Sequence, residues 1–312
     1  MCEYMLYNSL AISITNKCNA SCKFCGISAC NSNTKEDSLE KEVLEKICNE
    51  VIEIDNIKNI IFTGGEAFLY FNRIKSIIPL LKKGKKNIGI VTNGFIFKNI
   101  QTAEKMLNQI RNSGFNFLHI STDQYHLEYI DINTIKNAIL ICREIGIDVT
   151  LKIGVQRFDT TYVKIIEELD ENIFNTSIQF YPIMPIGRAS TLTEDIFFSK
   201  PIAELDLSCK HSTTLFIDEK GYIYPCCFFE HPKSMILGNI RTNSISEAIS
   251  LARKNKCYKE IYLCGFNKLV DNLIRNHIIS LEDRYVDACH LCNVIFGDTK
   301  YQNVLEKYYT DK

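Results

Sequence analysis

The chain of 312 residues contains no tryptophan, few glycines and prolines, and no apolar run long enough to cross a membrane. Its 36 basic and 37 acidic residues nearly balance and form no basic stripe, which argues against a nucleic-acid partner. The N-terminus lacks the charged and apolar regions of a signal peptide. We therefore expect a globular, cytoplasmic chain with no membrane span and a core large enough for one or two domains.

Cysteine, in contrast, is abundant, with 14 residues. A cytosolic chain of this size does not use so many thiols for disulfides, and their clustering at two ends of the chain indicates metal instead. The first group is Cys18, Cys22 and Cys25 in the run C-N-A-S-C-K-F-C. Three thiolates on one loop can hold three irons of a [4Fe–4S] cluster, which leaves one iron open to a small-molecule ligand. A zinc loop and three unrelated buried thiols are the alternatives.

Strand-like and helix-like segments alternate between residues 10 and 190, which predicts a parallel sheet with helices outside it. The expected strands are Leu10–Thr15, Asn59–Thr63, Asn87–Thr92, Phe117–Ser121, Asp148–Ile153 and Ser177–Tyr181. The expected helices are Lys41–Ile54, Asn72–Lys82, Thr102–Asn112, Asp131–Glu144 and Tyr162–Leu169. Six such units fit an α/β fold, namely a partial (β/α)₆ barrel of the TIM type. A doubly wound sheet shows the same alternation of strands and helices. In barrels, the loops after the strands build the active site, and the first cysteine group follows the first strand.

Two short motifs end other strands of this predicted barrel. Gly64, Gly65 and Glu66 follow the second strand, where paired glycines allow close backbone approach and the carboxylate can accept from an ammonium group. Ser121 and Asp123 follow the fourth strand, where their oxygens can hydrogen-bond a sugar. An ordinary turn explains the first motif as well, and a helix cap or turn explains the second.

The spacing C-x₃-C-x₂-C, with Phe24 before the last cysteine and G-G-E after the second strand, resembles the radical S-adenosylmethionine (SAM) superfamily. The resemblance implies that SAM chelates the open iron and is cleaved reductively to a 5′-deoxyadenosyl radical. It also implies that G-G-E contacts the methionine amino group and that Ser121 and Asp123 contact the ribose. Phe24 and Tyr181 are then expected to pack near the adenine. Arg188, in a Gly-Arg-Ala turn, can pair with a carboxylate or form a surface ion pair.

The pattern changes after about residue 195, so we expect the barrel core at 1–195 and a small α+β domain at 196–312. A hairpin is expected at Leu215–Ile217 and Tyr222–Tyr224, followed by helices at Ser244–Lys254 and Lys268–Ile279 and a short terminal polar helix. A second cysteine group lies here: Cys209, Cys226, Cys289 and Cys292. Its first half resembles SPASM and twitch domains, which implies one closed auxiliary [4Fe–4S] cluster. A structural zinc site with the same thiolates is the alternative.

Cys227 follows Cys226 directly, and neighbouring residues cannot easily both reach one cluster. A free cysteine is usually a small buried hydrophobe, but a thiol beside a radical site can also donate a hydrogen atom. The runs C-N-A-S-C-K-F-C, S-T-D-Q-Y-H, I-Y-P-C-C and A-C-H-L-C-N together resemble the peptidyl epimerases that make epipeptides. That resemblance implies that Cys227 is the hydrogen donor, and it draws attention to His126, for which packing or capping is the simpler role.

The leading hypothesis is therefore a radical SAM epimerase that converts L- to D-residues in a ribosomally made precursor peptide. It needs SAM, two [4Fe–4S] clusters and an external electron donor such as flavodoxin or ferredoxin. A radical SAM dehydrogenase or crosslinking enzyme is the second hypothesis, and a non-catalytic Fe–S or zinc protein is the third. Only 17 residues precede Cys18, so we expect no separate peptide-recognition domain ahead of it. The remaining cysteines are taken as structural, although Cys257 or Cys264 could replace a ligand.

Overall fold

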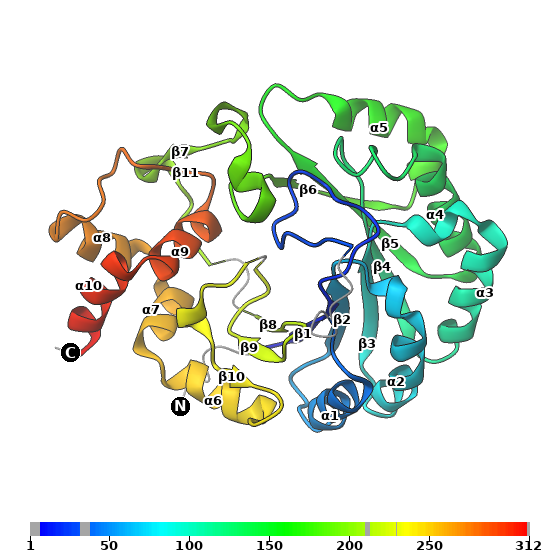
Figure 1. Cartoon of the computed structure of the whole chain (residues 1–312), viewed down its shortest axis with the longest axis horizontal. Helices are drawn as coiled ribbons and strands as arrows, with labels where there is room; N and C mark the ends of the chain where they lie inside the picture. The colour runs from blue at the N-terminus through cyan, green and yellow to red at the C-terminus, as the bar shows by residue number, and fades with distance from the viewer. Residues whose placement is uncertain (1–6, 32–37, 210–212, 229, 311–312) are drawn as a thin grey trace.

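The computed structural model describes residues 7–31, 38–209, 213–228 and 230–310. Within them, one nine-stranded sheet runs through the molecule in the order β10-β9-β8-β1-β2-β3-β4-β5-β6. Figure 1 shows this sheet curving around the middle of the molecule, with one set of helices on its outer side and the C-terminal helices grouped at the opposite end. The arrangement is a partial barrel joined to a smaller α+β part.

The barrel part consists of parallel strands whose connections carry helices. The strands are β1 (Ser9–Thr15), β2 (Asn59–Gly64), β3 (Asn87–Thr92), β4 (Phe115–Ser121), β5 (Asp148–Val155) and β6 (Ser177–Pro182). The helices are α1 (Lys41–Ile52), α2 (Phe71–Lys83), α3 (Ile100–Arg111), α4 (Ile132–Ile145) and α5 (Thr161–Leu169). Each helix has one apolar face, which it buries against the outer face of the sheet, as expected for parallel βα units.

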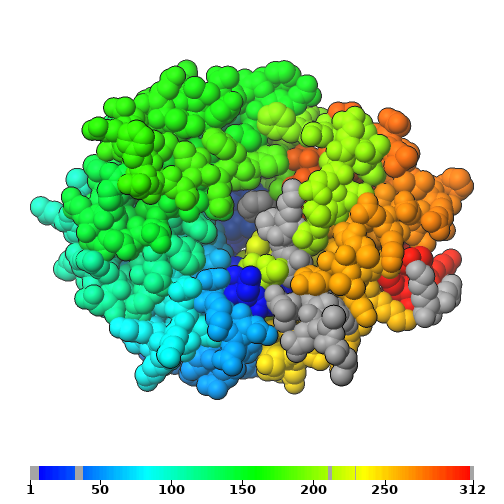
Figure 2. Space-filling model, turned by 180° about the vertical axis from the view of Figure 1, so that it is seen from behind, coloured from blue at the N-terminus to red at the C-terminus, as the bar shows by residue number. Residues whose placement is uncertain are grey.

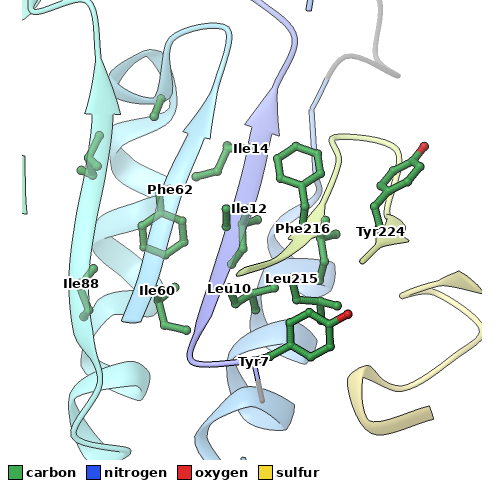
Figure 3. Packing of buried hydrophobic residues seen from close by; sticks show 14 of the residues in the cluster. Tyr7, Leu10, Ile12, Ile14, Ile60, Phe62, Ile88, Leu215, Phe216 and Tyr224 are labelled. Atoms are coloured by element: carbon green, nitrogen blue, oxygen red, sulfur yellow. The ribbon is translucent and has the colours of Figure 1, made fainter. Parts of the chain in front are cut away.

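The strand β1 is the centre of the core. All seven of its residues are buried, and it pairs with β2 on one side and with β8 (Thr214–Ile217) on the other, both in parallel. Figure 3 shows Ile12 and Ile14 on β1 with Ile60 and Phe62 on β2, and Leu215 on β8 beyond β1. A strand that is buried on both faces usually reads as a continuous apolar run, but β1 also buries the small polar side chains of Ser9, Ser13 and Thr15.

The C-terminal part extends the same sheet instead of forming a separate one. β9 (Tyr222–Tyr224) is antiparallel to β8, and β10 (Gly238–Asn239) is antiparallel to β9. The helices that follow are α6 (Ile245–Lys254), α7 (Lys256–Cys264), α8 (Asn267–Arg275), α9 (Ala288–Gly297) and α10 (Thr299–Thr310). A small second sheet pairs β7 (Lys200–Pro201) with β11 (Arg284–Tyr285). The sheet therefore continues past residue 195, and the domain boundary at this point stays a prediction.

The predicted fold class is confirmed, and the six predicted barrel strands are present with small differences at their ends. Two helices were not predicted. α7 contains Cys257, and α9 contains both Cys289 and Cys292. The α9 segment has a weak amphipathic pattern because most of its residues are apolar or cysteine, so the period-3.6 signal is faint.

Parallel strands bring the loops after β1, β2, β3 and β4 to one edge of the sheet. The loop after β1 carries the first cysteine group. The loops after β2, β3 and β4 carry Glu66, Asn93 and Asp123 in that order. Figure 2 shows the surface hollowed where the barrel segments face the C-terminal segments, with N-terminal blue atoms visible inside the hollow. Among the helices that the structure describes, none has both the length and the apolar composition needed to cross a membrane.

Candidate active site

The loop after β1 holds Cys18, Cys22 and Cys25 in one compact turn. The Cys25 amide donates to the Cys22 carbonyl oxygen at 3.1 Å, and the Cys18 amide donates to the Cys30 carbonyl oxygen at 2.9 Å. Cys18 and Cys22 are buried, and Cys25 is half-buried. The backbone bonds fix the loop, so the three predicted ligands come from a single preformed segment.

The thiols of this loop lie close enough to affect one another electrostatically. The pKa of Cys18 is raised to about 11 and that of Cys22 to about 12, mainly by burial, with smaller contributions from the charges of Glu66 or Asp123 and of the neighbouring cysteines. A buried group of thiolates is unfavourable unless cations compensate it, as iron does in a cluster. The donor set and its burial therefore fit a [4Fe–4S] cluster bound by three cysteines.

The glycine pair after β2 packs directly against the start of this loop. The Gly65 amide donates to the Thr15 carbonyl oxygen at 2.6 Å, and a Cβ at Gly65 would lie 2.2 Å from the Lys17 carbonyl oxygen. Gly64 has φ = +130°, and a Cβ there would lie 2.3 Å from the Thr15 carbonyl oxygen. Both positions thus require glycine for close backbone approach, and the backbone that they meet belongs to the cysteine loop.

The carboxylate of Glu66 is fully buried and is held by several internal donors. Its Oε1 accepts from the Phe68 amide at 3.0 Å and the Thr92 hydroxyl at 2.8 Å, and its Oε2 accepts from the Asn93 amide at 2.8 Å. Burial raises the pKa of this carboxyl to about 7. Glu66 therefore joins the ends of β2 and β3, in addition to any contact that it makes with SAM.

Asn93, at the end of β3, links this network to the cysteine loop. Its Nδ2 donates to Asn19 Oδ1 at 2.9 Å and lies 3.8 Å from Cys18 Sγ. The sequence showed only an Asn-Gly pair after a predicted strand, for which a turn is the default interpretation. Its position after a strand, at the same sheet edge as Glu66, was the signal that could have indicated a functional role.

The segment after β4 forms a second polar group at this edge. Asp123 is buried and accepts from the Tyr125 and His126 amides at 3.0 Å each. His126 Nδ1 donates to Asp123 Oδ2 at 2.9 Å. Ser121 is half-buried, and Thr122 between them is buried with a hydroxyl that makes no hydrogen bond among the described residues. Asp123 is thus the residue that caps this turn, while the His126 ring hydrogen-bonds Asp123 and packs against the cysteine loop.

The His126 ring contacts the cysteine loop at Phe24, which is the centre of a group of aromatic side chains. The Phe24 ring stacks on Tyr125 with centroids 5.2 Å apart and meets His126 edge-on at 5.3 Å. Tyr181, at the end of β6, is half-buried near Asp123, Cys22 and Cys25, and desolvation of its hydroxyl raises its pKa well above the usual value. The predicted residues Phe24, Asp123 and Tyr181 are thus near one another and near the cysteine loop.

Arg188 contacts the backbone of the cysteine loop. Its Nε donates to the Cys22 carbonyl oxygen at 2.9 Å, and its Nη1 donates to the Ala29 carbonyl oxygen at 2.5 Å. Gly187, with φ = +59°, lies so close to the loop that a Cβ would be 2.5 Å from the Gly26 carbonyl oxygen. The observed partners of Arg188 are carbonyl groups, so its role in this structure is to hold the loop in place.

The second cysteine group is assembled from three distant segments. Cys209 precedes β8, Cys226 follows β9, and Cys289 and Cys292 lie one turn apart on α9. Charge on Cys209, Cys226 and Cys289 acts on the Cys292 thiol. Burial raises the pKa of Cys226, Cys289 and Cys292 well above the ordinary value of a thiol. Asp287 caps α9 by accepting from the Cys289 and His290 amides at 2.9 Å. Four half-buried cysteines that are near enough to affect one another electrostatically fit a closed [4Fe–4S] cluster.

Other side chains near this group are informative. The Tyr7 hydroxyl is buried without a hydrogen-bond partner in the described part of the chain, and charge on Cys226 or Cys209 would act on it. Cys257 is buried near Cys292, whereas Cys264 is exposed. Cys257 is therefore the nearer of the two alternative ligands.

The two kinds of metal site make different demands on the thiols. Around one Zn²⁺ the ligands must converge on a point, whereas a cubane presents four separate irons and its cysteines lie farther apart. In the ranges that the structure describes, no three His, Cys, Asp or Glu side chains are arranged to hold one metal ion.

Cys227 lies between the second cysteine group and the barrel. Burial raises the pKa of its thiol, while a hydrogen bond with the Thr214 side chain and the charge of Lys152 lower it. Lys152 is on β5 and Thr214 is on β8, so Cys227 faces strands of the barrel sheet. Charge on Cys209 raises the pKa of both Cys226 and Cys227, and Cys227 in addition meets Lys152 and Thr214.

Comparison with known families gives two matches along the chain. Residues 12–161 match the model of the radical SAM superfamily, and residues 209–293 match SPASM, an iron–sulfur cluster-binding domain. The first match contains the loop after β1 and the G-G-E motif, and the second contains all four cysteines of the C-terminal group.

Similar proteins cover nearly the whole chain. A "Putative peptide biosynthesis protein YydG" of Bacillus subtilis (strain 168) is 27% identical over 98% of this chain and 99% of its own length. A GTP 3′,8-cyclase of Clostridium acetobutylicum is 28% identical over 59% of each chain. Among solved structures, "Native anSMEcpe with bound AdoMet" has a TM-score of 0.61 at 16% identity over 84% of this chain and 83% of its own. At this identity the structural likeness shows the fold alone.

Proposed function

We propose, on the premise that this chain belongs to the radical SAM superfamily and carries a SPASM domain, that it epimerises L- to D-residues in a ribosomally made precursor peptide. The similarity to a putative peptide biosynthesis protein over nearly the full length supports a peptide as the substrate. The arrangement of the two cysteine groups and of Cys227 supports the reaction type.

In this proposal Cys18, Cys22 and Cys25 hold the SAM-binding cluster, and Cys209, Cys226, Cys289 and Cys292 hold the auxiliary cluster. When bound, the first cluster and SAM together supply a 5′-deoxyadenosyl radical, which can take a hydrogen atom from carbon. The electron for this comes from an external one-electron donor such as flavodoxin or ferredoxin. The protein contributes binding, orientation and exclusion of water.

The SAM-side residues have distinct tasks. The backbone of Gly64 and Gly65 and the carboxylate of Glu66 form the surface for the methionine amino group. Ser121 and Asp123 bind the ribose, with Asp123 oriented by the amides of Tyr125 and His126. Phe24 and Tyr181 form the apolar surface for the adenine. Arg188 keeps the loop that carries the cysteines in one conformation.

Cys227 performs the step that makes the reaction an epimerisation. Loss of the α-hydrogen leaves a planar carbon radical on the peptide. The Cys227 S–H bond breaks, its hydrogen atom forms the new C–H bond on the opposite face, and a thiyl radical remains on sulfur. One electron from the external donor and one proton then restore the thiol. The observation that carries this proposal is the half-buried Cys227 thiol next to Cys226, which hydrogen-bonds the Thr214 side chain on β8 and lies near the charge of Lys152 on β5.

A labelling experiment tests the proposal. Because a thiol exchanges its hydrogen with water, the peptide product made in D₂O should gain one deuterium at the α-carbon, and in H₂O its mass should not change. Cys227→Ser should still cleave SAM and abstract the α-hydrogen, since its O–H bond is too strong to replace the thiol. It should yield little epimer. Mass spectrometry and chiral amino-acid analysis provide the measurements.

The same experiment separates the other hypotheses. A product two mass units lighter, or full epimerisation by Cys227→Ser, would favour dehydrogenation or crosslinking, with the auxiliary cluster accepting the substrate electron. Failure of the reduced, reconstituted protein to consume SAM would favour a non-catalytic role.

A further inference from the structure

Lys152, on β5, is a half-buried lysine to which the SAM site assigns no role. Its neighbours on the strand, Leu151 and Ile153, are fully buried in the core. Successive side chains of a strand point to opposite faces, so Lys152 and Gly154 share the other face of the sheet. Figure 1 shows the barrel helices on the outer side of the sheet. Lys152 is therefore on the inner face, which looks toward the middle of the molecule.

Gly154 shows how Lys152 lies relative to the SAM-side residues. A Cβ at Gly154 would lie 3.1 Å from Asp123 Oδ2 and 3.4 Å from the Tyr181 ring. Gly154 is therefore next to the two residues that the proposal assigns to the ribose and the adenine. Lys152 comes two residues earlier on the same face, which places it about 7 Å farther back along the strand. It lies beneath the SAM-side residues, inside the barrel.

Gln179, on β6, is the hydrogen-bond partner of Lys152. The two residues are opposite each other in the register of β5 and β6, and Lys152 Nζ donates to Gln179 Oε1. An ammonium group only donates, so the Gln179 atom that it meets must be the oxygen, and the amide nitrogen is left for another partner. Gln179 is exposed. The Lys152–Gln179 pair is therefore open to solvent and still has N–H donors on both side chains.

The surroundings of the pair favour an oxygen acceptor from a ligand. Among the residues that the structure describes, no carboxylate forms an ion pair with Lys152. Desolvation lowers the pKa of Lys152, and charge on Cys227 opposes this. The pKa of His119, on β4, is lowered to about 4 by burial and by the charge of Lys152, so this imidazole is neutral near pH 7. A partly desolvated ammonium group whose hydrogen-bonding capacity is not filled gains most from an added oxygen acceptor.

We infer that the Lys152–Gln179 pair binds an oxygen of the substrate peptide, from a backbone carbonyl or an acidic side chain next to the residue that reacts. The pair lies beneath the SAM-side residues, and the charge of Lys152 acts on Cys227. A peptide oxygen held at the pair keeps the neighbouring α-carbon close to both. This inference rests on the proposed function, and it adds the residues that recognise and place the peptide.

Binding of labelled peptides tests the pair without turnover. The probes are fluorescein-labelled synthetic peptides that cover the short open reading frames next to the gene, and fluorescence anisotropy gives their Kd for the SAM-loaded protein without reductant. In Lys152→Met the Kd should rise about tenfold or more, the order expected when a hydrogen bond to a charged group is lost. Lys152→Arg should recover part of the affinity. Gln179→Ala, at an exposed position, should raise the Kd about threefold. Lys164→Met, on the exposed side of α5, is the matched control and should leave the Kd unchanged. Iron content checks that each variant is folded.

Changes in the peptide identify the oxygen. Replacing its acidic residues by their amides removes the carboxylates, and a thioamide at the reacting residue weakens the carbonyl as an acceptor. The change that removes the partner of Lys152 should weaken binding to wild type but have no further effect in Lys152→Met. Wild-type Kd values in Lys152→Met and Gln179→Ala, an equal loss in Lys164→Met, or full additivity of both peptide changes with Lys152→Met would overturn the inference. If a bound peptide is not epimerised, the proposed function fails, and the Kd comparison still decides the role of the pair.

Discussion

The two cysteine groups contrast in how the chain builds them. The first group lies within eight residues of one loop, from Cys18 to Cys25, and its backbone bonds are mostly local. The second group combines the segments before β8, after β9 and on α9, so that Cys209 and Cys292 are far apart in the sequence. A local group needs only its loop to be held, whereas a dispersed group exists only once the hairpin and α9 have packed together.

The contrast also extends to what holds each group. The first loop is fixed from three directions, by the Gly64–Gly65 backbone, by Asn93 and by Arg188. The second group has its own capped helix in α9 and the buried Tyr7 beside it. We therefore expect substitutions in the first group to affect SAM chemistry directly, and substitutions in the second to affect one cluster and the packing of the C-terminal part.

The largest effect is expected from replacing Cys18, Cys22 and Cys25 together with Ala. SAM cleavage should be abolished, and reconstituted protein should carry about four irons per chain where wild type carries about eight. The second cluster should remain because its ligands come from other segments. Iron analysis and detection of 5′-deoxyadenosine measure this. Full iron loading of the triple variant, or zinc in the second site, would show that the assignment is wrong.

The next effect is expected from single substitutions in the dispersed group. Cys209→Ala or Cys289→Ala should remove the auxiliary cluster, leave the first cluster and SAM cleavage in place, and lower the thermal stability of the C-terminal part. Cys264→Ala is the matched control, because Cys264 is exposed and should change neither iron content nor unfolding temperature. If Cys257→Ala removes the cluster instead, Cys257 is a ligand and one of the four assigned cysteines is not.

A smaller effect is expected from Gly65→Ala, which tests how the first loop is held. The added Cβ would lie 2.2 Å from the Lys17 carbonyl oxygen, so the loop or the end of β2 must move. We expect a loss of about 1–3 kcal/mol in the free energy of unfolding, typical of overpacking, and weaker SAM binding. Gly297→Ala is the control, since its only close neighbour is a Pro232 side-chain atom at 3.9 Å. Equal stability in the two variants would contradict the requirement for glycine at position 65.

Much of the barrel was predictable because its signals are local. Each predicted strand is an apolar run with periodic segments on either side, and β3 was predicted with the bounds that the structure has. The positions of Gly64, Gly65 and Glu66 at a strand end followed from the same pattern. The helix α9 was not predicted, although both of its cysteines were identified, because a ten-residue segment interrupted by thiols has little periodicity.

The sequence by itself determined the six alternating strand–helix units, the three-cysteine loop and the presence of a second set of cysteines, since spacing and hydrophobic alternation need no long-range contacts. Only the tertiary structure decided that β8 joins β1 in one continuous sheet, that Arg188 binds the cysteine loop through carbonyl groups, and that Asn93 reaches Cys18. It also decided that Cys227 meets Lys152 and Thr214. These facts depend on segments brought together by burial of apolar surface, and the local sequence around a residue carries no information on which distant side chains it will meet.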